Sequence, residues 1–268
     1  MVYRTKENFI AKKINPFTNK PYDSSWILYQ LTDSHDYEIM NGGEDVYTLK
    51  VSKKYPQWKM SVFDFLQFQE AYNKNIILSI SDGDYEAAKL NYANHNYNDH
   101  FLRSYESDIL IHSTTLENWR KIQSDGCLKS WNILNKNDET LETQPIGKLL
   151  GDPDEFSDYI MFSSGGISSE IVVLSKQQKK ITMNQNMEYQ PGARLYFDAE
   201  KMAKAGLLIR DGCHLKVKDQ LPLIPYLIWT ATWQSVGLAN ALSTPKEFTE
   251  LSNGAFNKLF NQKLVTTF

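Results

Sequence analysis

The sequence predicts an α+β fold made of short strands and amphipathic helices. Two observations lead to this class: short apolar runs bounded by turn residues recur along the chain, and other segments repeat apolar residues at helical spacing. The chain has 268 residues, of which 41% are hydrophobic and 13% aromatic, enough to bury one large or two small cores. We expect three regions: residues 1–104, an α+β region of unknown role; residues 105–230, which carry the chemistry; and residues 231–268, a helical segment packed on the core.

The N-terminal region alternates predicted strands and helices. After a turn at Asn41-Gly42-Gly43, we expect strands at 46–51 and 76–80, and helices at 61–73 and 82–93. Residues 94–100 are polar and are predicted to be a connector. Its histidines, His95 and His100, are a possible pair of metal ligands, but no cysteine or further histidine supports them, so a solvated loop is preferred.

A strand, a polar corner and a helix are predicted at residues 109–126. Ile109, Leu110 and Ile111 form an apolar run, and Thr114 precedes Glu117 at the spacing of a capping box, so a helix over 115–125 begins at Thr114 or Thr115. Gly126 is expected to end that helix. His112 then lies at the end of the strand, beside hydroxyls and helix N-terminal amides that suit anionic or ribose-containing ligands. The alternative is a core histidine bonded to a neighbouring carbonyl.

The rest of the middle region is predicted to be rich in strands. Residues 129–157 are irregular, and the apolar run 159–162 ends in Ser163-Ser164-Gly165-Gly166. Further strands are expected at 170–175 and 193–198. Asp198 caps a helix over 199–205, and residues 207–217 form a hairpin with its turn at Asp211-Gly212. Residues 236–262 are predicted to be helical, with Pro245 at a helix start after Thr244.

Composition excludes several classes of protein. The N-terminus lacks the apolar core of a signal peptide and no run approaches the roughly 18 apolar residues of a membrane span, so we expect a cytoplasmic protein with no membrane partner. Cys127 and Cys213 are too few and too far apart for a zinc ribbon, so buried thiols and no metal site are expected. The net charge of −3 argues against a nucleic-acid-coating protein, yet residues 176–218 hold nine Lys/Arg against four Asp/Glu, which is compatible with a phosphate-facing surface. The chain has no P-loop, no GxGxxG motif and no nucleophile elbow.

Four blocks, in order over residues 109–228, resemble the ADP-ribosyltransferase fold, and most closely its RNA (tRNA) 2′-phosphotransferase branch. The run from His112 to Ile122, followed by Gly126, resembles the family's first strand-and-helix signature. Tyr159 to Ser163 resembles its second motif, and Ala193 to Gly206 resembles its strand followed by Asp-Ala-Glu-Lys-Met. The fourth block is Asp211-Gly212-Cys213-His214-Leu215 with Leu221-Pro222. Residues 1–104 show no such resemblance.

The resemblance implies a split β-sheet that binds NAD as co-substrate in a cleft between two small sheets. His112 would hold the ribose on the nicotinamide side or an adjacent phosphate, and Ser163 would contact that ribose from the second strand. The residues implied to bind NAD are His112, Ser113, Thr114, Thr115, Tyr159, Ser163 and Ser164. The candidate catalytic residues are His112, Glu170, Arg194 and Arg210.

The implied chemistry is displacement of nicotinamide at the ribose anomeric carbon by a nucleophile on the opposite face. In the branch named above, the nucleophile is an RNA 2′-phosphate held by basic side chains, for which Arg120, Arg194, Arg210 and Lys216 are candidates. Tyr159 would stack on nicotinamide or serve as an inward strand aromatic. Glu170 would orient a ribose hydroxyl, act as a base, or be an exposed residue at a strand start.

The chain departs from the family pattern in two places. It has no N-terminal Leu-Arg-His-like motif or Arg pair after the second motif, and Lys216 stands near the place of the late-strand glutamate of many ADP-ribosyltransferases. Three functions therefore remain open: transfer to a phosphate or nucleic-acid acceptor such as RNA; a toxin or effector that modifies a protein or nucleic acid; and an inactive NAD- or nucleic-acid-binding module.

Overall fold

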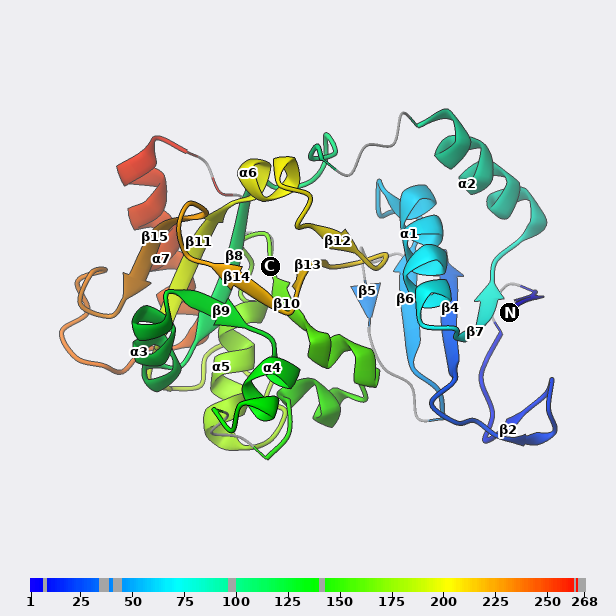
Figure 1. Ribbon diagram of the computed structural model, residues 1–268, viewed down its shortest axis with the longest axis horizontal. Helices are drawn as coiled ribbons and strands as arrows, with labels where there is room; N and C mark the ends of the chain where they lie inside the picture. The colour runs from blue at the N-terminus through cyan, green and yellow to red at the C-terminus, as the bar shows by residue number, and fades with distance from the viewer. Residues whose placement is uncertain are drawn as a thin grey trace. The chain divides into compact units, whose positions relative to one another are not determined.

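The computed structural model describes residues 1–6, 9–33, 39–40, 45–95, 100–139, 143–262 and 264 and has a mixed α+β fold (Figure 1). The chain forms two compact units. Unit 1 contains Met1–Asn98, Leu150–Phe156 and Arg210–His214, and unit 2 contains Asp99–Leu149, Ser157–Ile209 and Leu215–Phe268. No helix in the described part of the chain is both long and apolar enough to cross a membrane.

Unit 1 is built on a five-stranded sheet of order β1-β7-β4-β6-β5. Its strands are β1 (Val2–Thr5), β4 (Trp26–Thr32), β5 (Ile39–Met40), β6 (Thr48–Ser52) and β7 (Asn75–Ser79). All neighbours are parallel except β5 and β6. Helix α1 (Trp58–Ala71) connects β6 to β7 and lies over one face of the sheet, and α2 (Asp82–Asn94) follows β7 (Figure 1). A small hairpin, β2 (Ile14–Asn15) with β3 (Lys20–Pro21), completes the unit.

Four predicted elements of unit 1 are confirmed. The structure also has a central strand, β4, that the sequence analysis does not predict. Helices α1 and α2 and strands β6 and β7 match the predicted segments to within a few residues. Strand β4 was not predicted, although Ile27, Leu28 and Tyr29 are at most 2% exposed and β4 pairs with both β6 and β7. The turn predicted at 41–43 and part of the connector at 94–100 lie outside the described residues.

Unit 2 is built on two three-stranded sheets, of order β15-β11-β8 and β10-β13-β12, of which Arg210 in β12 is assigned to unit 1. The first comprises β8 (Ile109–Thr114), β11 (Ala193–Asp198) and β15 (Leu227–Thr232); the second comprises β10 (Tyr159–Phe162), β12 (Ile209–Arg210) and β13 (Leu215–Lys218). Strand β9 (Cys127–Lys129) pairs with β14 (Gln220–Pro222). The helices are α3 (Leu116–Asp125), α4 (Trp131–Lys136), α5 (Ser168–Gln178), α6 (Ala199–Lys204) and α7 (Pro245–Phe260), with 3-10 turns η1 (Ile146–Leu150) and η2 (Asp154–Asp158).

A single pair of residues, Ile111 and Ser163, connects strands β8 and β10. Each donates its backbone N–H to the other's carbonyl, at 2.8 and 2.9 Å. Away from this pair, β8 is paired with β11 and β10 with β13, so the two sheets separate from the junction onward. On one face of β8, Ile109 and Ile111 pack with residues of α5 and α7; on the other face, Leu110 packs in a second core with Trp119.

The predicted corner after β8 is confirmed with its cap shifted by one residue. The hydroxyl of Thr115 accepts the amide of Asn118 at 3.3 Å, so Thr115 is the N-cap of α3, whereas Thr114 still belongs to β8. His112 therefore lies inside the strand and not at its end. Gly126 ends α3 with φ +67°, as predicted for a C-terminal glycine.

Helix α6 and the helix start at Pro245 are confirmed, each directly after its cap, whereas residues 236–244 of the predicted helical segment are not helical. Asp198 accepts the amide of Lys201 at 2.9 Å, and Thr244 accepts the amide of Glu247 at 3.2 Å. The strand predicted at 170–175 is wrong, because this segment lies within α5. Its β-branched apolar run is typical of strands, but as a helix it buries Ile171 and Leu174 in the core with α7. The stretch 129–157, predicted to be irregular, contains α4, η1 and most of η2.

Gly192 allows the chain entering β11 to lie against the corner between β8 and α3. A Cβ atom at this position would be 1.9 Å from the Thr114 carbonyl oxygen and 2.7 Å from the Thr115 Cα. Both obstacles are backbone, so no side-chain rotation relieves the clash. The absence of a side chain at Gly192 therefore allows the two backbone segments to approach this closely.

The variant Gly192→Ala is expected to lower the free energy of unfolding by about 3 kcal/mol or to prevent folding, because the added methyl overlaps backbone atoms. Gly254→Ala is the matched control, since a Cβ atom there meets nothing within 4 Å in helix α7. It should raise stability by about 0.5 to 1 kcal/mol through helix propensity. Urea denaturation followed by circular dichroism measures both. Equal stability of the two variants would contradict the close approach at Gly192.

Candidate functional site

His112 reaches from one sheet of unit 2 toward the other. Its Nδ1 lies 3.1 Å from the carbonyl oxygen of Met161 in β10, and its ring meets the ring of Phe162 edge to face. Since a carbonyl only accepts hydrogen bonds, Nδ1 carries the proton and Nε2 carries the lone pair. Burial lowers the pKa of His112 to about 4, despite the opposing effect of the Met161 carbonyl. At neutral pH the side chain is an uncharged imidazole whose Nε2 accepts hydrogen bonds.

Ser163 of β10 is paired with Ile111, the residue before His112. Its side chain therefore lies on the opposite face of the strands from the imidazole. Directly opposed residues of antiparallel strands project to one face, so Ser163 shares a face with Ile111, and His112 shares the opposite face with Phe162. The Ser163 hydroxyl oxygen is buried without a hydrogen-bond partner among the described residues. Such an oxygen is costly to leave unsatisfied, which makes it a candidate to bind a ligand or a water molecule.

Behind this junction, Arg194 of β11 and Glu170 of α5 form an ion pair that is sealed from solvent. Their side chains are 0% and 1% exposed, and Arg194 Nη1 lies 3.3 Å from Glu170 Oε1. Nη1 also donates to the Ser169 hydroxyl at 2.7 Å. The structure therefore brings the candidate catalytic residues Arg194 and Glu170 together, beneath the surface and not facing solvent.

The remaining guanidinium hydrogens of Arg194 bind the turn after β10 and helix α7. Nη2 donates to the carbonyls of Gly165 and Gly166, at 2.8 and 3.2 Å. Nε contacts the Tyr196 hydroxyl at 3.2 Å and the Asn253 side-chain oxygen at 3.3 Å. Asn253 in turn donates to the Gly165 carbonyl at 2.8 Å. One arginine thus ties the glycine turn to α7.

Glu170 has partners on both carboxylate oxygens. Ser113 donates its hydroxyl to Oε1, and the Tyr189 hydroxyl donates to Oε2 at 2.7 Å. The pKa of Tyr189 is raised, mainly by burial and further by the Glu170 charge. The expectation that Glu170 is an exposed residue at a strand start is wrong, because it lies buried in the first turn of α5. Its contacts fix Ser113 of β8 against α5.

The other residues implied to bind NAD differ in exposure. Thr114 is 4% exposed, Thr115 caps α3, and Ser164 is exposed in the turn after β10. Tyr159 is 8% exposed, and the Lys216 ammonium lies over its ring at 5.0 Å, so it packs as an inward strand aromatic. This arrangement disfavours stacking of its ring on nicotinamide.

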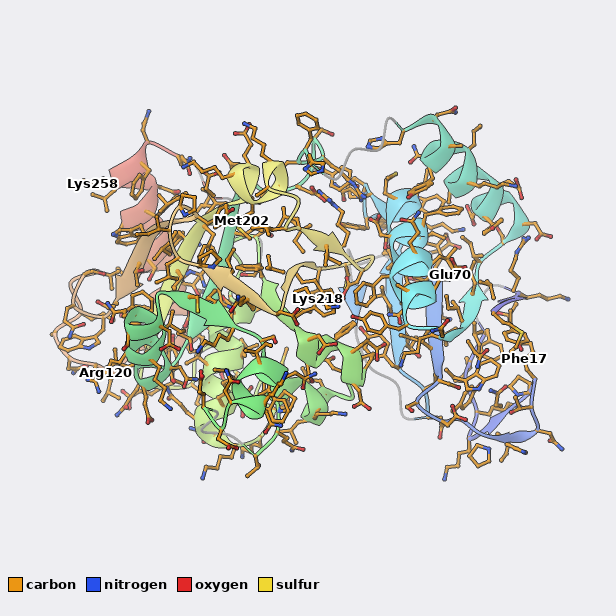
Figure 2. The ribbon with its side chains drawn as sticks, in the orientation of Figure 1. Phe17, Glu70, Arg120, Met202, Lys218 and Lys258 are labelled. Atoms are coloured by element: carbon orange, nitrogen blue, oxygen red, sulfur yellow. The ribbon has the colours of Figure 1, made fainter. Side chains whose placement is uncertain are left out.

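The basic candidates differ in exposure and do not all belong to the same unit. Arg194 and Lys216 are both 0% exposed, and Arg210 belongs to unit 1. Arg120 is exposed on α3, where Figure 2 shows its side chain at the surface. Three contributors to the buried network, Ser169, Tyr189 and Asn253, were not predicted, because no local pattern marks them.

Comparison of the chain with protein-family models, curated protein sequences and solved structures finds no match. The site is therefore interpreted from its own residues.

Breaking the buried pair is expected to destabilise the protein far more than breaking an exposed one. Glu170→Gln should lower the free energy of unfolding by about 3 kcal/mol or more, since it leaves the buried Arg194 charge without its counter-ion. Glu200→Gln is the control: its carboxylate binds Lys204 at 2.7 Å with both side chains more than half exposed, and its loss should be about 0.5 kcal/mol at most. Urea denaturation measures the stability of both variants. Equal losses would contradict a stabilising role of the buried Arg194–Glu170 pair.

The half-buried His112 makes stability depend on pH. Its pKa of about 4 in the folded chain lies below the ordinary value of 6.5, so the unfolded chain binds its proton first as the pH falls. The stabilisation is complete above pH 6.5 and is lost as the pH falls to 4, by on the order of 3 kcal/mol. In His112→Gln this pH-dependent part should be missing. Urea denaturation of both proteins at several pH values gives the difference, and a difference that is constant with pH would be inconsistent with a half-buried neutral imidazole.

Proposed function

We propose that unit 2 is an NAD-dependent ADP-ribosyltransferase domain that transfers ADP-ribose to a phosphate or nucleic-acid acceptor. The observation that carries this proposal is the junction of the two small sheets at Ile111 and Ser163, where the first two motifs that resemble the family meet. In the sequence these two residues are far apart. A split pair of sheets with His112 beside the split is the arrangement that the resemblance implies.

His112 supports the proposal through its protonation state. A neutral imidazole with Nδ1 bound to a carbonyl presents Nε2 as an acceptor, which suits a ribose hydroxyl. A protonated ring would present a second donor and a positive charge beside a nicotinamide that is already cationic. The low pKa of His112, caused by burial, keeps the acceptor form across the physiological range.

The turn at residues 163–166 supports the proposal through its rigidity. Arg194 and Asn253 hold the Gly165 carbonyl from two directions. The turn is thus fixed before any ligand binds, which reduces the ordering cost of binding. We assign Arg194 and Glu170 as positioning residues: they bind the turn and Ser113 and do not touch the reacting atoms.

The reaction itself requires little acid–base chemistry when the acceptor is a phosphate. The bond between the anomeric carbon and nicotinamide nitrogen breaks, and its electron pair neutralises the pyridinium ring. A phosphate oxygen, already anionic at neutral pH, forms the new bond to the anomeric carbon, so no proton must be removed. A hydroxyl or amide acceptor would need a general base. Near the place of the family's late glutamate the chain has the buried Lys216 and no carboxylate to serve as that base, so the phosphate acceptor is favoured.

The proposal predicts nicotinamide release that depends on the acceptor and on His112. We expect the full chain to release nicotinamide from NAD with 2′-phosphorylated RNA and to do so more slowly with the same RNA lacking the phosphate. His112→Ala should slow release about 100-fold, because the ribose is no longer oriented. His95→Ala, which alters an exposed histidine in unit 1, should leave the rate unchanged.

Parallel incubations with DNA and with a cell lysate separate the alternatives. Release only with DNA or lysate protein would replace the RNA acceptor by the toxin or effector function. No release with any acceptor, together with unchanged NAD affinity in His112→Ala, would refute the enzyme and its NAD site together.

A further inference from the structure

Three side chains with metal-ligating atoms gather in the loop between β12 and β13, within unit 1. Asp211, Cys213 and His214 each offer one ligand atom, and these atoms all lie within 4.8 Å of one another. The Cys213 sulfur is 2.9 Å from His214 Nδ1, and that nitrogen is 3.2 Å from Asp211 Oδ2. The prediction of buried thiols is wrong, because both cysteines are partly exposed.

The loop holds these atoms in place without a ligand. Asp211 Oδ1 accepts the backbone amides of Cys213 and His214, at 3.0 and 2.7 Å, so Oδ2 is the oxygen turned toward the imidazole. Gly212 has φ +101°, and a Cβ atom there would lie 2.9 Å from the Ser61 carbonyl and from Phe65 Cβ. Its own carbonyl accepts the Ser61 hydroxyl. Fixed donor atoms of this kind favour cation binding, because little order has to be imposed on them.

The geometry argues against a nucleophilic cysteine with a general base. Such an arrangement places the nucleophile at one imidazole nitrogen and the orienting carboxylate at the other. Here Nδ1 is the nearest nitrogen to both the sulfur and the carboxylate, and the sulfur is also 3.6 Å from Nε2. The three ligand atoms lie within 4.8 Å of one another and do not form a relay.

We propose that Asp211, Cys213 and His214 bind one transition-metal ion of the zinc class, with the fourth position left to solvent or another ligand. One sulfur, one nitrogen and one oxygen donor suit Zn²⁺, whereas Mg²⁺ and Ca²⁺ prefer oxygen alone. With metal–ligand distances of about 2.0 to 2.3 Å, tetrahedral donors lie roughly 3.2 to 3.6 Å apart. The Nδ1–Oδ2 separation of 3.2 Å agrees with the lower end of that range, and the Sγ–Nδ1 separation of 2.9 Å has to lengthen when the metal binds.

Cobalt(II) absorption tests the ligand set on the full chain after chelator dialysis. We expect one equivalent of Co²⁺ to give visible bands and a near-ultraviolet thiolate charge-transfer band, and Zn²⁺ to displace it. Cys213→Ser should abolish the charge-transfer band, and His214→Gln should weaken Co²⁺ binding at least 10-fold, since ligand loss removes a metal–donor bond. Cys127→Ser and His95→Gln are the matched controls and should leave the spectrum unchanged. A band that survives Cys213→Ser, or that is lost in Cys127→Ser, would overturn the assignment.

Thiol alkylation of the unaltered protein gives a second test that needs no folded variant. Equimolar Zn²⁺ should slow iodoacetamide modification of Cys213 at least 10-fold while the rate at Cys127, which is also partly exposed, stays the same. Peptide mass spectrometry reports both residues from one sample. Equal rates at Cys213 with and without Zn²⁺ would refute the site, whether or not NAD is turned over.

Discussion

The architecture of unit 2 depends on one buried arginine. Removing a guanidinium from water costs several kcal/mol, which is recovered only if its hydrogen bonds and its charge are satisfied. Arg194 meets both conditions: six acceptor atoms surround its five N–H groups, and Glu170 supplies the counter-charge. These acceptors come from β11, α5, the turn after β10, and α7. Segments distant in sequence are therefore held together by one guanidinium group, in which any N–H left without an acceptor would be costly.

This constraint reaches the junction of the sheets through two short paths. Along one path, Arg194 fixes the Gly165 carbonyl and thereby the turn directly after Ser163, whose backbone pairs with Ile111. Along the other, Glu170 accepts the Ser113 hydroxyl and holds β8 against α5. His112 lies between these two restrained residues of β8, and its own ring is anchored on Met161. The imidazole is thus held by its own restrained strand and by the Met161 carbonyl of β10.

Local signals in the sequence predict the corner around His112. They do not predict helix α5 or the buried Arg194–Glu170 pair. Caps and glycines act over one helical turn, so α3, α6 and α7 were predicted from Thr115, Asp198 and Thr244. Helix α5 was read as a strand because β-branched residues favour strands locally, whereas its buried contacts with α7 decide otherwise. The pairing of Arg194 with Glu170 is non-local, and both residues resemble surface charges in the sequence. Burial alone distinguishes them.

That distinction decides how charged residues of unit 2 should be interpreted. A side chain that reacts with a ligand must have a free position toward it, and each N–H of Arg194 and each carboxylate oxygen of Glu170 is already bound. Their conversion to reactive groups would require breaking contacts that are worth more in a dry interior than in water. The free position belongs instead to His112, because its Nδ1 is committed to the Met161 carbonyl and its Nε2 carries a lone pair. The charged pair therefore holds Ser113 and the glycine turn in place, and it has no position left for a ligand within the described part of the chain.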